Sequence, residues 1–280
     1  MSKNVQTLRF AAAVAFAGAA AMPAWAVDGV ILIDQNKATA GSVTPGDAPG
    51  FPVSINQPGS YKLTGDLTVP DANTTAIEIN ASHVTLDLNG FAILGPTDCS
   101  GNLNPCANAG SGHGITTFHG DNVTPAFNIT IRNGTVQGMG GAGIYLRGDS
   151  HLVEYVHARS NGGGGISIRD SDDHGSSIVQ HCNAQRNGGS LTSGISVGRG
   201  LVTHNTADVN TSGITMSTGT AAYNVVTRNA TFGMFLDAII PGQGGAYFGN
   251  SVSGNGLQDV LPIGGWVNAG QNVCGTVLCP

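Results

Sequence analysis

Apolar and polar residues alternate with a period of two over most of the chain, and this alternation predicts short β-strands. Glycine and asparagine interrupt the alternation every few residues. They exclude long helices and predict tight turns, because both residues tolerate left-handed backbone angles. In five places a glycine is followed by alternating apolar residues: Gly143–Leu146, Gly165–Ile168, Gly194–Val197, Gly213–Met216 and Gly233–Leu236.

A second sequence motif also occurs five times and ends with asparagine. Each copy spans nine residues. It begins with an apolar residue, has a variable residue at its fourth position and a small apolar residue at its sixth, and ends with asparagine at its ninth. The final asparagine recurs every 19 to 26 residues, a spacing typical of stacked units that cannot bury a core alone. We expect these asparagines to hydrogen-bond along the stack. The copies are Val153–Asn161, Val179–Asn187, Val202–Asn210, Ala221–Asn229 and Tyr247–Asn255.

Together the two motifs resemble the repeats of the right-handed parallel β-helix proteins, the pectate-lyase-like superfamily, and in particular its Asn-rich periplasmic type. The resemblance covers roughly residues 77–255 and implies an all-β, single-stranded solenoid of about seven coils with a cap at each end. This superfamily includes lyases, hydrolases, epimerases, adhesins and binding proteins, so the fold alone does not settle the chemistry.

Four segments are expected along the chain. Residues 1–26 form an export signal, residues 27–76 contribute N-terminal cap strands, residues 77–255 form the solenoid, and residues 256–280 form a C-terminal cap. In the first segment Lys3 and Arg9 precede or open a short apolar run, and Ala24–Ala26 has the form of a cleavage site. Because the run is shorter than the roughly 20 residues that span a bilayer, we expect no transmembrane anchor and a periplasmic or extracellular protein.

Composition supports this location and narrows the class of partner. After residue 26 the chain has 9 basic and 17 acidic residues, a net charge of −8, which argues against a nucleic-acid partner. Cys99 and Cys106 bracket a polar loop, and Cys274 and Cys279 bracket the last turn, so two local disulfides are predicted. Cys182 falls in a column that holds asparagine in later copies, where we expect a buried free thiol.

The alternation also predicts which side chains point outward. With Ile144 inward, Tyr145 and Arg147 point outward, and Arg169 lies one coil from Arg147. Two arginines at this spacing repel unless acids or an anionic ligand offset their charges. A longer connection with several acids follows, and such connections favour functional residues. The candidate site has catalytic residues Asp149, Asp170, Asp172, Asp173 and His174, and substrate-binding residues Tyr145, Arg147, His151 and Arg169.

Three reactions could use this site. A lyase or epimerase acting on an acidic sugar needs a cation on the carboxylate, either arginine or a calcium ion held by the aspartates, and a base such as His174, His151 or Tyr145. The Asp173–His174 pair faintly resembles the Asp/His loop of β-helix uronate epimerases, although the proline and the full motif are missing. A hydrolase needs two carboxyl groups about 5 to 9.5 Å apart. The structural alternative is a solvated network in which aspartate neutralises arginine.

A second outward column holds aromatic and imidazole rings at one-coil spacing: Tyr155, His181, His204 and Tyr223. It could form a sugar-binding strip or, through its two histidines, hold copper or zinc, but the sequence offers no third ligand. The alternative is that the exposed rings only pack on one another.

The sequence therefore predicts an exported solenoid that binds polysaccharide, with acidic sugars favoured, and that processes it in the enzymatic alternative. The competing prediction is a non-catalytic structural rod that presents its faces to a surface partner. Calcium is the one cofactor that the acidic residues favour. The sequence fixes neither the reaction nor the oligomeric state.

Overall fold

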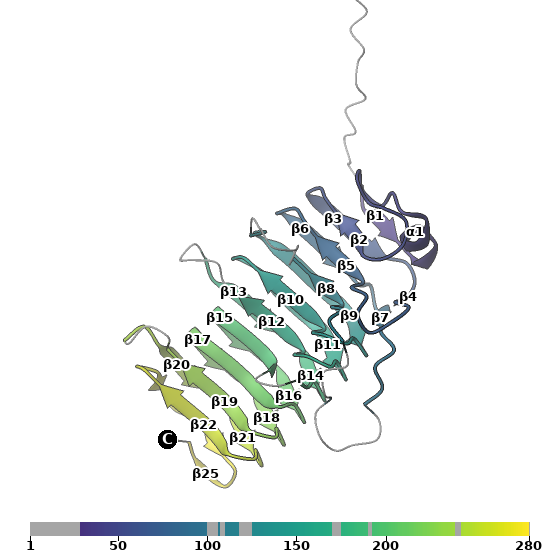
Figure 1. The fold of residues 1–280 in the computed structure, drawn as a ribbon. Helices are drawn as coiled ribbons and strands as arrows, with labels where there is room; N and C mark the ends of the chain where they lie inside the picture. Colours follow the sequence, from purple (N-terminus) through teal and green to yellow (C-terminus); the bar gives the residue numbers. More distant parts are fainter. Residues whose placement is uncertain are drawn as a thin grey trace, which may run out of the picture.

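The computed structural model describes residues 29–99, 106, 110–117, 125–169, 175–189, 192–238 and 242–279. The predicted signal, Met1–Ala26, lies outside the described residues. Within them the chain forms 25 β-strands and one short helix, α1 (Gln35–Ala40). The strands stack as successive coils from one end of the molecule to the other (Figure 1). Each complete coil contributes to three faces, which we number in chain order.

Face 1 consists of parallel strands in unbroken register, each paired with the corresponding strand of the next coil. Its inward residues are apolar and buried in every coil, as the period-two alternation predicts. The strands are β2 (Val53–Ile55), β5 (Ile77–Ile79), β8 (Ile115–Thr116), β10 (Ile144–Arg147), β12 (Ile166–Arg169), the first parts of β15 (Ser193–Thr203) and β17 (Ser212–Ala222), β19 (Phe232–Asp237) and β22 (Gln258–Ile263).

Face 2 follows face 1 along the chain and is also parallel throughout. Strands β15 and β17 run on from face 1 into face 2 without interruption. The strands of face 2 are β1 (Ile31–Ile33), β3 (Gly59–Leu63), β6 (Val84–Asp87), the first parts of β9 (Ile129–Gln137) and β11 (Leu152–Arg159), β13 (Ser177–Gln180), the second parts of β15 and β17, β20 (Gly245–Phe248) and β23 (Val267–Asn268).

Face 3 completes each coil and is parallel except at its last pairing, where β25 runs antiparallel to β24. Its strands are β4 (Leu67–Thr68), β7 (Ala92–Leu94), the second parts of β9 and β11, β14 (Asn183–Gln185), β16 (Thr206–Asp208), β18 (Val225–Thr227), β21 (Ser251–Ser253), β24 (Val273–Cys274) and β25 (Val277–Leu278).

The parallel stack extends beyond residues 77–255 at both ends. Strands β2 and β3, which the sequence placed in a cap, pair in register with β5 and β6. Strands β22, β23 and β24 continue the three faces after residue 255. The described part of face 1 alone has nine stacked strands, so the solenoid has more coils than the seven counted from the repeat.

Two buried corners are built from asparagine ladders. Where face 3 meets face 1, the Nδ2 of Asn161 donates to the Oδ1 of Asn187 at 2.9 Å. The same contact continues through Asn210, Asn229 and Asn255 at 2.9 to 3.1 Å. The predicted stacking of the final asparagines is therefore confirmed. A second ladder lies between faces 2 and 3 and contains Asn205, Asn224, Asn250 and Asn272.

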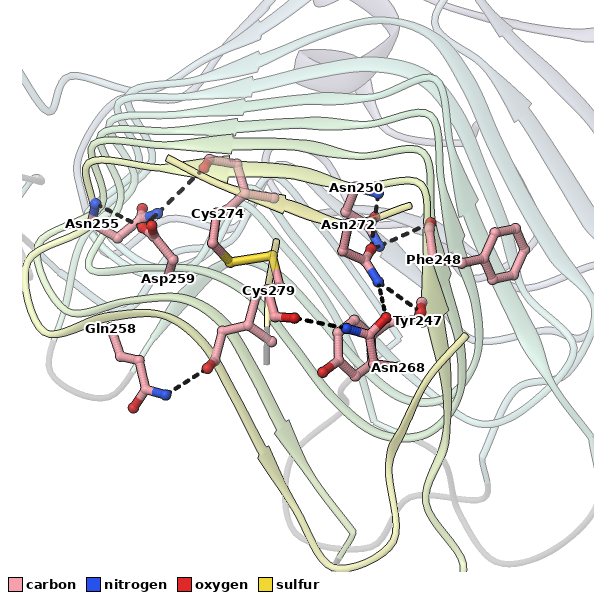
Figure 2. The surroundings of a disulfide bond; sticks show 12 residues. Tyr247, Phe248, Asn250, Asn255, Gln258, Asp259, Asn268, Asn272, Cys274 and Cys279 are labelled. Atoms are coloured by element: carbon pink, nitrogen blue, oxygen red, sulfur yellow. Dashed lines mark hydrogen bonds between the residues drawn. A yellow bond between two sulfur atoms is a disulfide. The ribbon is translucent and has the colours of Figure 1, made fainter. Parts of the chain in front are cut away.

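Each end of the solenoid is closed by a different device. At the N-terminal end, helix α1 begins after Asp34, whose carboxylate accepts from the Lys37 backbone N–H, and buries Ala38. At the C-terminal end, the Cys274–Cys279 disulfide lies across the last coil, beside the ends of both ladders (Figure 2). The second predicted pair, Cys99 and Cys106, is also within disulfide distance, with Cα atoms 5.4 Å apart.

Candidate functional site

A groove of about 820 Å³ runs along the outer side of face 1. Outward side chains of successive coils lie along it in register: Tyr145, Ser167, Ser196, Thr215 and Phe235. At about 4.8 Å per coil, the four steps from Tyr145 to Phe235 cover about 19 Å. The corner between faces 3 and 1 supplies the other lining residues, mainly glycine, serine and threonine: Gly110, Ser111, Gly141, Gly163, Gly164, Thr192, Ser193, Thr211, Ser212 and Thr231.

The N-terminal end of the groove combines two stacked rings with a cation. The rings of His113 and Tyr145 have centroids 5.2 Å apart and planes within 12° of parallel. The guanidinium carbon of Arg169 lies 5.6 Å from the centroid of the Tyr145 ring, a cation–π contact. The Nδ1 of His113 accepts a hydrogen bond from the Ala142 N–H at 3.0 Å, and burial lowers the pKa of this imidazole. At neutral pH Arg169 therefore carries the positive charge of this end.

The C-terminal end of the groove is apolar. The rings of Phe232 and Phe235 stack with centroids 5.2 Å apart and an interplanar angle of 27°. Between the two ends, hydroxyl groups hydrogen-bond in pairs, Ser193 with Thr215 at 2.7 Å and Ser212 with Thr231 at 2.6 Å. A hydroxyl has one donor and two acceptor positions, so each keeps hydrogen-bonding capacity after this contact.

The predicted arginine column is confirmed, since Arg147 and Arg169 are register partners on β10 and β12. Arg169 is exposed and lines the groove, whereas Arg147 is half-buried. Of the other predicted residues, Tyr145 lies in the groove. Asp170, Asp172, Asp173 and His174 lie outside the described residues, so their roles remain predictions.

Asp149 and His151 lie in the turn between β10 and β11 and point into the protein, with 1% of each residue exposed. The Nδ1 of His151 accepts from the Ile129 N–H at 3.2 Å. Burial lowers the pKa of His151 to about 4, against a smaller raising effect of the Arg147 backbone. Among the described residues, none is a hydrogen-bond partner of the two buried carboxylate oxygens of Asp149 or of the buried Nε2 of His151. Neither side chain lines the groove.

The second predicted surface, the ring ladder, is defined as Tyr155, His181, His204 and Tyr223 at the corner between faces 2 and 3. Neighbouring rings have centroids 5.0 to 5.1 Å apart. Phe248 contacts the last of them in a T-shaped arrangement with an interplanar angle of 88°. Neighbouring rings therefore cover much of one another's faces. A sugar stacks on the face of a ring, so this arrangement favours mutual packing over a sugar strip.

The structure also bears on the predicted metal and thiol chemistry. No cluster of three or more histidine, cysteine, aspartate or glutamate residues suited to a metal ion occurs among the described residues. Cys182 is buried and unpaired, and burial raises the pKa of its thiol to about 12. A thiol with this pKa is inert at neutral pH, in agreement with the predicted structural role.

The family follows from a match to one sequence model. Residues 114–273 match the family model described as the right-handed beta helix region. The chain belongs to the right-handed beta-helix family. No curated protein and no solved structure matches this β-helix protein. Its function therefore has to be argued from its own residues.

The sequence argument missed the rings of His113 and Phe232 in this β-helix protein, and also the glycine, serine and threonine residues at the corner between faces 3 and 1, such as Thr192. His113 precedes the second coil, and Phe232 immediately precedes a Gly-apolar strand. Phe232 could have been found, because residues at that position open face 1 in every repeat. His113 could have been found in the same way, because it immediately precedes Gly114 and Ile115, but the stacking of its ring on Tyr145 of the next coil was not visible in the sequence.

Proposed function

We propose that this β-helix protein binds a linear polysaccharide in the groove of face 1. The observation that carries the proposal is the composition of the groove, in which hydroxyl side chains lie between a ring pair with a cation and a second ring pair. Sugars bind to proteins by stacking on aromatic rings and by hydrogen bonds to hydroxyl groups. A groove of about 19 Å offers room for several consecutive sugar units.

Acidic sugars are the favoured ligand because of Arg169. Its guanidinium group carries a permanent charge and presents several donors, and an arginine binds a carboxylate through two parallel hydrogen bonds. The described residues that line the groove include no aspartate or glutamate that would repel a carboxylate. We therefore place the acidic unit beside Tyr145 and Arg169, and a less polar sugar face beside Phe232 and Phe235.

Processing of the bound chain is the second candidate function. It is favoured by the position of Arg169, which lines the groove and is followed directly in the sequence by Asp170, Asp172, Asp173 and His174. A lyase, an epimerase or a hydrolase would place its remaining groups in residues 170–174, directly after Arg169. The structural rod stays the alternative if no ligand binds.

Export to the periplasm or beyond the cell is also proposed. Two cysteine pairs at disulfide distance are compatible with an oxidising compartment. Across the part of the chain that the structure describes, no helix has the length and apolar character needed to traverse a bilayer. N-terminal sequencing of the secreted or periplasmic fraction would show whether the chain begins after Ala26.

Calorimetric titration with polygalacturonate and with a neutral glucan tests the binding proposal. We expect Arg169→Gln to weaken binding of the acidic polymer about tenfold, the effect of losing one charge-assisted contact, and to leave neutral binding unchanged. Phe235→Ala should weaken binding of both polymers, because stacking does not depend on charge.

Two variants outside the groove serve as matched controls. Arg159→Gln removes an exposed arginine of face 3, and Tyr155→Ala removes an exposed ring of the ring ladder. Both should bind like the wild type. Absence of binding to every acidic polymer tested, or equal losses in the control variants, would contradict the proposal.

Ultraviolet detection of unsaturated uronate products, with calcium and with a chelator, tests the lyase form of the second candidate. A signal that His174→Ala abolishes while binding is retained would support processing. Binding without product would leave a binding protein, or a hydrolase or epimerase that reducing-end and epimer analysis would reveal.

A further inference from the structure

We propose that two copies of this protein associate end to end through β25 and the last coil. Exposed large apolar side chains are most numerous at the C-terminal end of the described residues, with six there against Val30 and Leu32 at the N-terminal end. Val277 is 65% exposed and Leu278 is 77% exposed. Leu257, Ile263, Val267 and Val273, which also follow the repeats, are exposed as well.

The exposure of Val277 follows from the position of β25 in the stack. Cys274 and Val277 are directly opposite each other across the β24–β25 pair, and Cys274 is buried on the inner side of the sheet. Val277 therefore lies on the side that faces the core in every earlier coil, but none of the described residues covers it. An inward-type valine without a covering layer has an apolar surface that a further coil would bury.

The outer side of the same strand pair is apolar too. Val273 and Leu278 are register partners, and both are exposed. Within the described residues, β25 pairs with β24 alone, so its far edge presents backbone N–H and C=O groups. An exposed apolar edge strand of this kind is a template for pairing with another strand.

A second copy of the same end fits this edge because it is self-complementary. A twofold axis across the end of the solenoid places β25 antiparallel to β25 of the other copy, which repeats the antiparallel geometry already present between β24 and β25. In this arrangement each Val277 covers the uncovered side of the other. Such an isologous contact closes as a dimer, whereas a head-to-tail contact would give open filaments.

The low charge of the C-terminal end favours contact between two copies of this end over contact with a more acidic surface of the protein. The chain has a net charge of −6, but among residues 256–279 Asp259 is the only charged side chain. Its Oδ1 accepts from the Nδ2 of Asn255 at 2.8 Å and terminates the asparagine ladder. The last asparagine of the second ladder also finds its hydrogen-bond partner within the same chain. The Nδ2 of Asn272 donates to Asn268, which donates to the Cys279 carbonyl (Figure 2). Two acidic copies can therefore meet here with little repulsion and without breaking a ladder.

Sedimentation equilibrium of the purified protein tests the dimer. We expect a mass of twice the chain, and Leu278→Asp should reduce it to one chain, because a carboxylate would be buried at the interface. Leu32→Asp makes the same change at the opposite end, where Leu32 is exposed on β1, and should leave the dimer intact. A monomeric wild type at tens of micromolar, or loss of the dimer in Leu32→Asp, would overturn the proposal.

Hydrogen exchange provides a readout that does not depend on the folding of a variant. The backbone N–H groups of β25 alternate in direction, and since the Cys279 N–H donates to the Asn272 carbonyl, the Leu278 N–H points to the free edge. In the wild type, the amide of Leu278 should therefore be protected at high protein concentration and should exchange faster on dilution. Amides of β1 should show no such dependence. A dimer in which the exchange of β25 does not change with concentration would mean that another face forms the contact, and the proposal would be wrong.

Discussion

The asparagine ladder at the corner of faces 3 and 1 and the ring ladder at the corner of faces 2 and 3 both place one residue per coil at the same spacing. In the first, each buried amide makes several hydrogen bonds to its neighbours. In the second, exposed rings contact each other through their faces. The comparison shows that regular stacking alone does not determine how much a residue contributes to stability. The cost of replacing a ladder residue depends on which polar groups are then left buried without a hydrogen-bond partner.

Replacing an asparagine in the middle of the buried ladder should have the largest effect. The side chain of Asn210 donates to Ala184 and Asn229 and accepts from Asn187. Asn210→Ala leaves several of these groups buried and unsatisfied, at about 1 to 3 kcal/mol each, so we expect a loss of about 3 to 6 kcal/mol in the free energy of unfolding. Chemical denaturation measures it, and a loss below 1 kcal/mol would contradict the comparison.

The second largest effect concerns pH and the buried His151. Its pKa is about 4 in the folded protein and about 6.5 when unfolded, so the unfolded state binds the proton first as the pH falls. Stability is complete above pH 6.5 and is lost progressively towards pH 4, by about 2 kcal/mol at pH 5. His151→Gln should flatten this part of the stability curve, whereas Tyr155→Gly, which removes no titrating imidazole, should not. An unchanged slope in His151→Gln would show that another group is responsible.

Cys182 allows a gain in stability to be tested at the upper end of the second ladder. Its backbone N–H donates to the Oδ1 of Asn205 at 2.9 Å, as the asparagines below it do, and its Sγ lies 3.6 Å from the Val153 carbonyl. In Cys182→Asn the Nδ2 should replace this weak thiol contact with a normal hydrogen bond, which stabilises by about 1 kcal/mol. A lower melting temperature would show that the larger amide does not fit the site.

The smallest effect should come from the exposed ladder. Tyr155 has a φ of 53°, a left-handed conformation that is unfavourable for tyrosine and free for glycine. Gly249 already occupies the corresponding position below Tyr223, with a φ of 64°, and its missing Cβ leaves room for the Tyr223 ring. Tyr155→Gly should therefore change stability by less than about 1 kcal/mol, since the lost stacking is offset by relief of strain. A loss as large as that of Asn210→Ala would remove the distinction between the ladders.

The sequence predicted the features that repeat and missed those that occur once. The columns of asparagine, apolar residues and outward side chains follow from a fixed spacing, and the structure confirms them. The first and last coils lack the repeated motif, so the sequence did not show that they belong to the stack. Asn272 nevertheless occupies the same column as Asn250.

The inward position of Asp149 and His151 could not be predicted for a local reason. Alternation determines which side a residue faces only within a strand, and the strand ends at Arg147. Gly148 follows with a φ of 120°, which turns the backbone so that the earlier alternation no longer applies. A prediction that continued the pattern across this glycine placed both side chains in an outward cleft.

The Cys274–Cys279 disulfide limits how far the end of the chain lengthens under force. The bond closes a loop of residues 274–279 within the last coil, so a force that pulls the two ends apart cannot extend this loop. The coils before it are held to one another by hydrogen bonds, and detaching them one at a time should lengthen the chain stepwise. Each detached coil frees a different length of chain, since register partners on face 1 lie 38 residues apart from Ile77 to Ile115 but 19 apart from Ile195 to Ile214. At about 3.3 to 3.6 Å per extended residue, the steps should range from about 60 to about 140 Å.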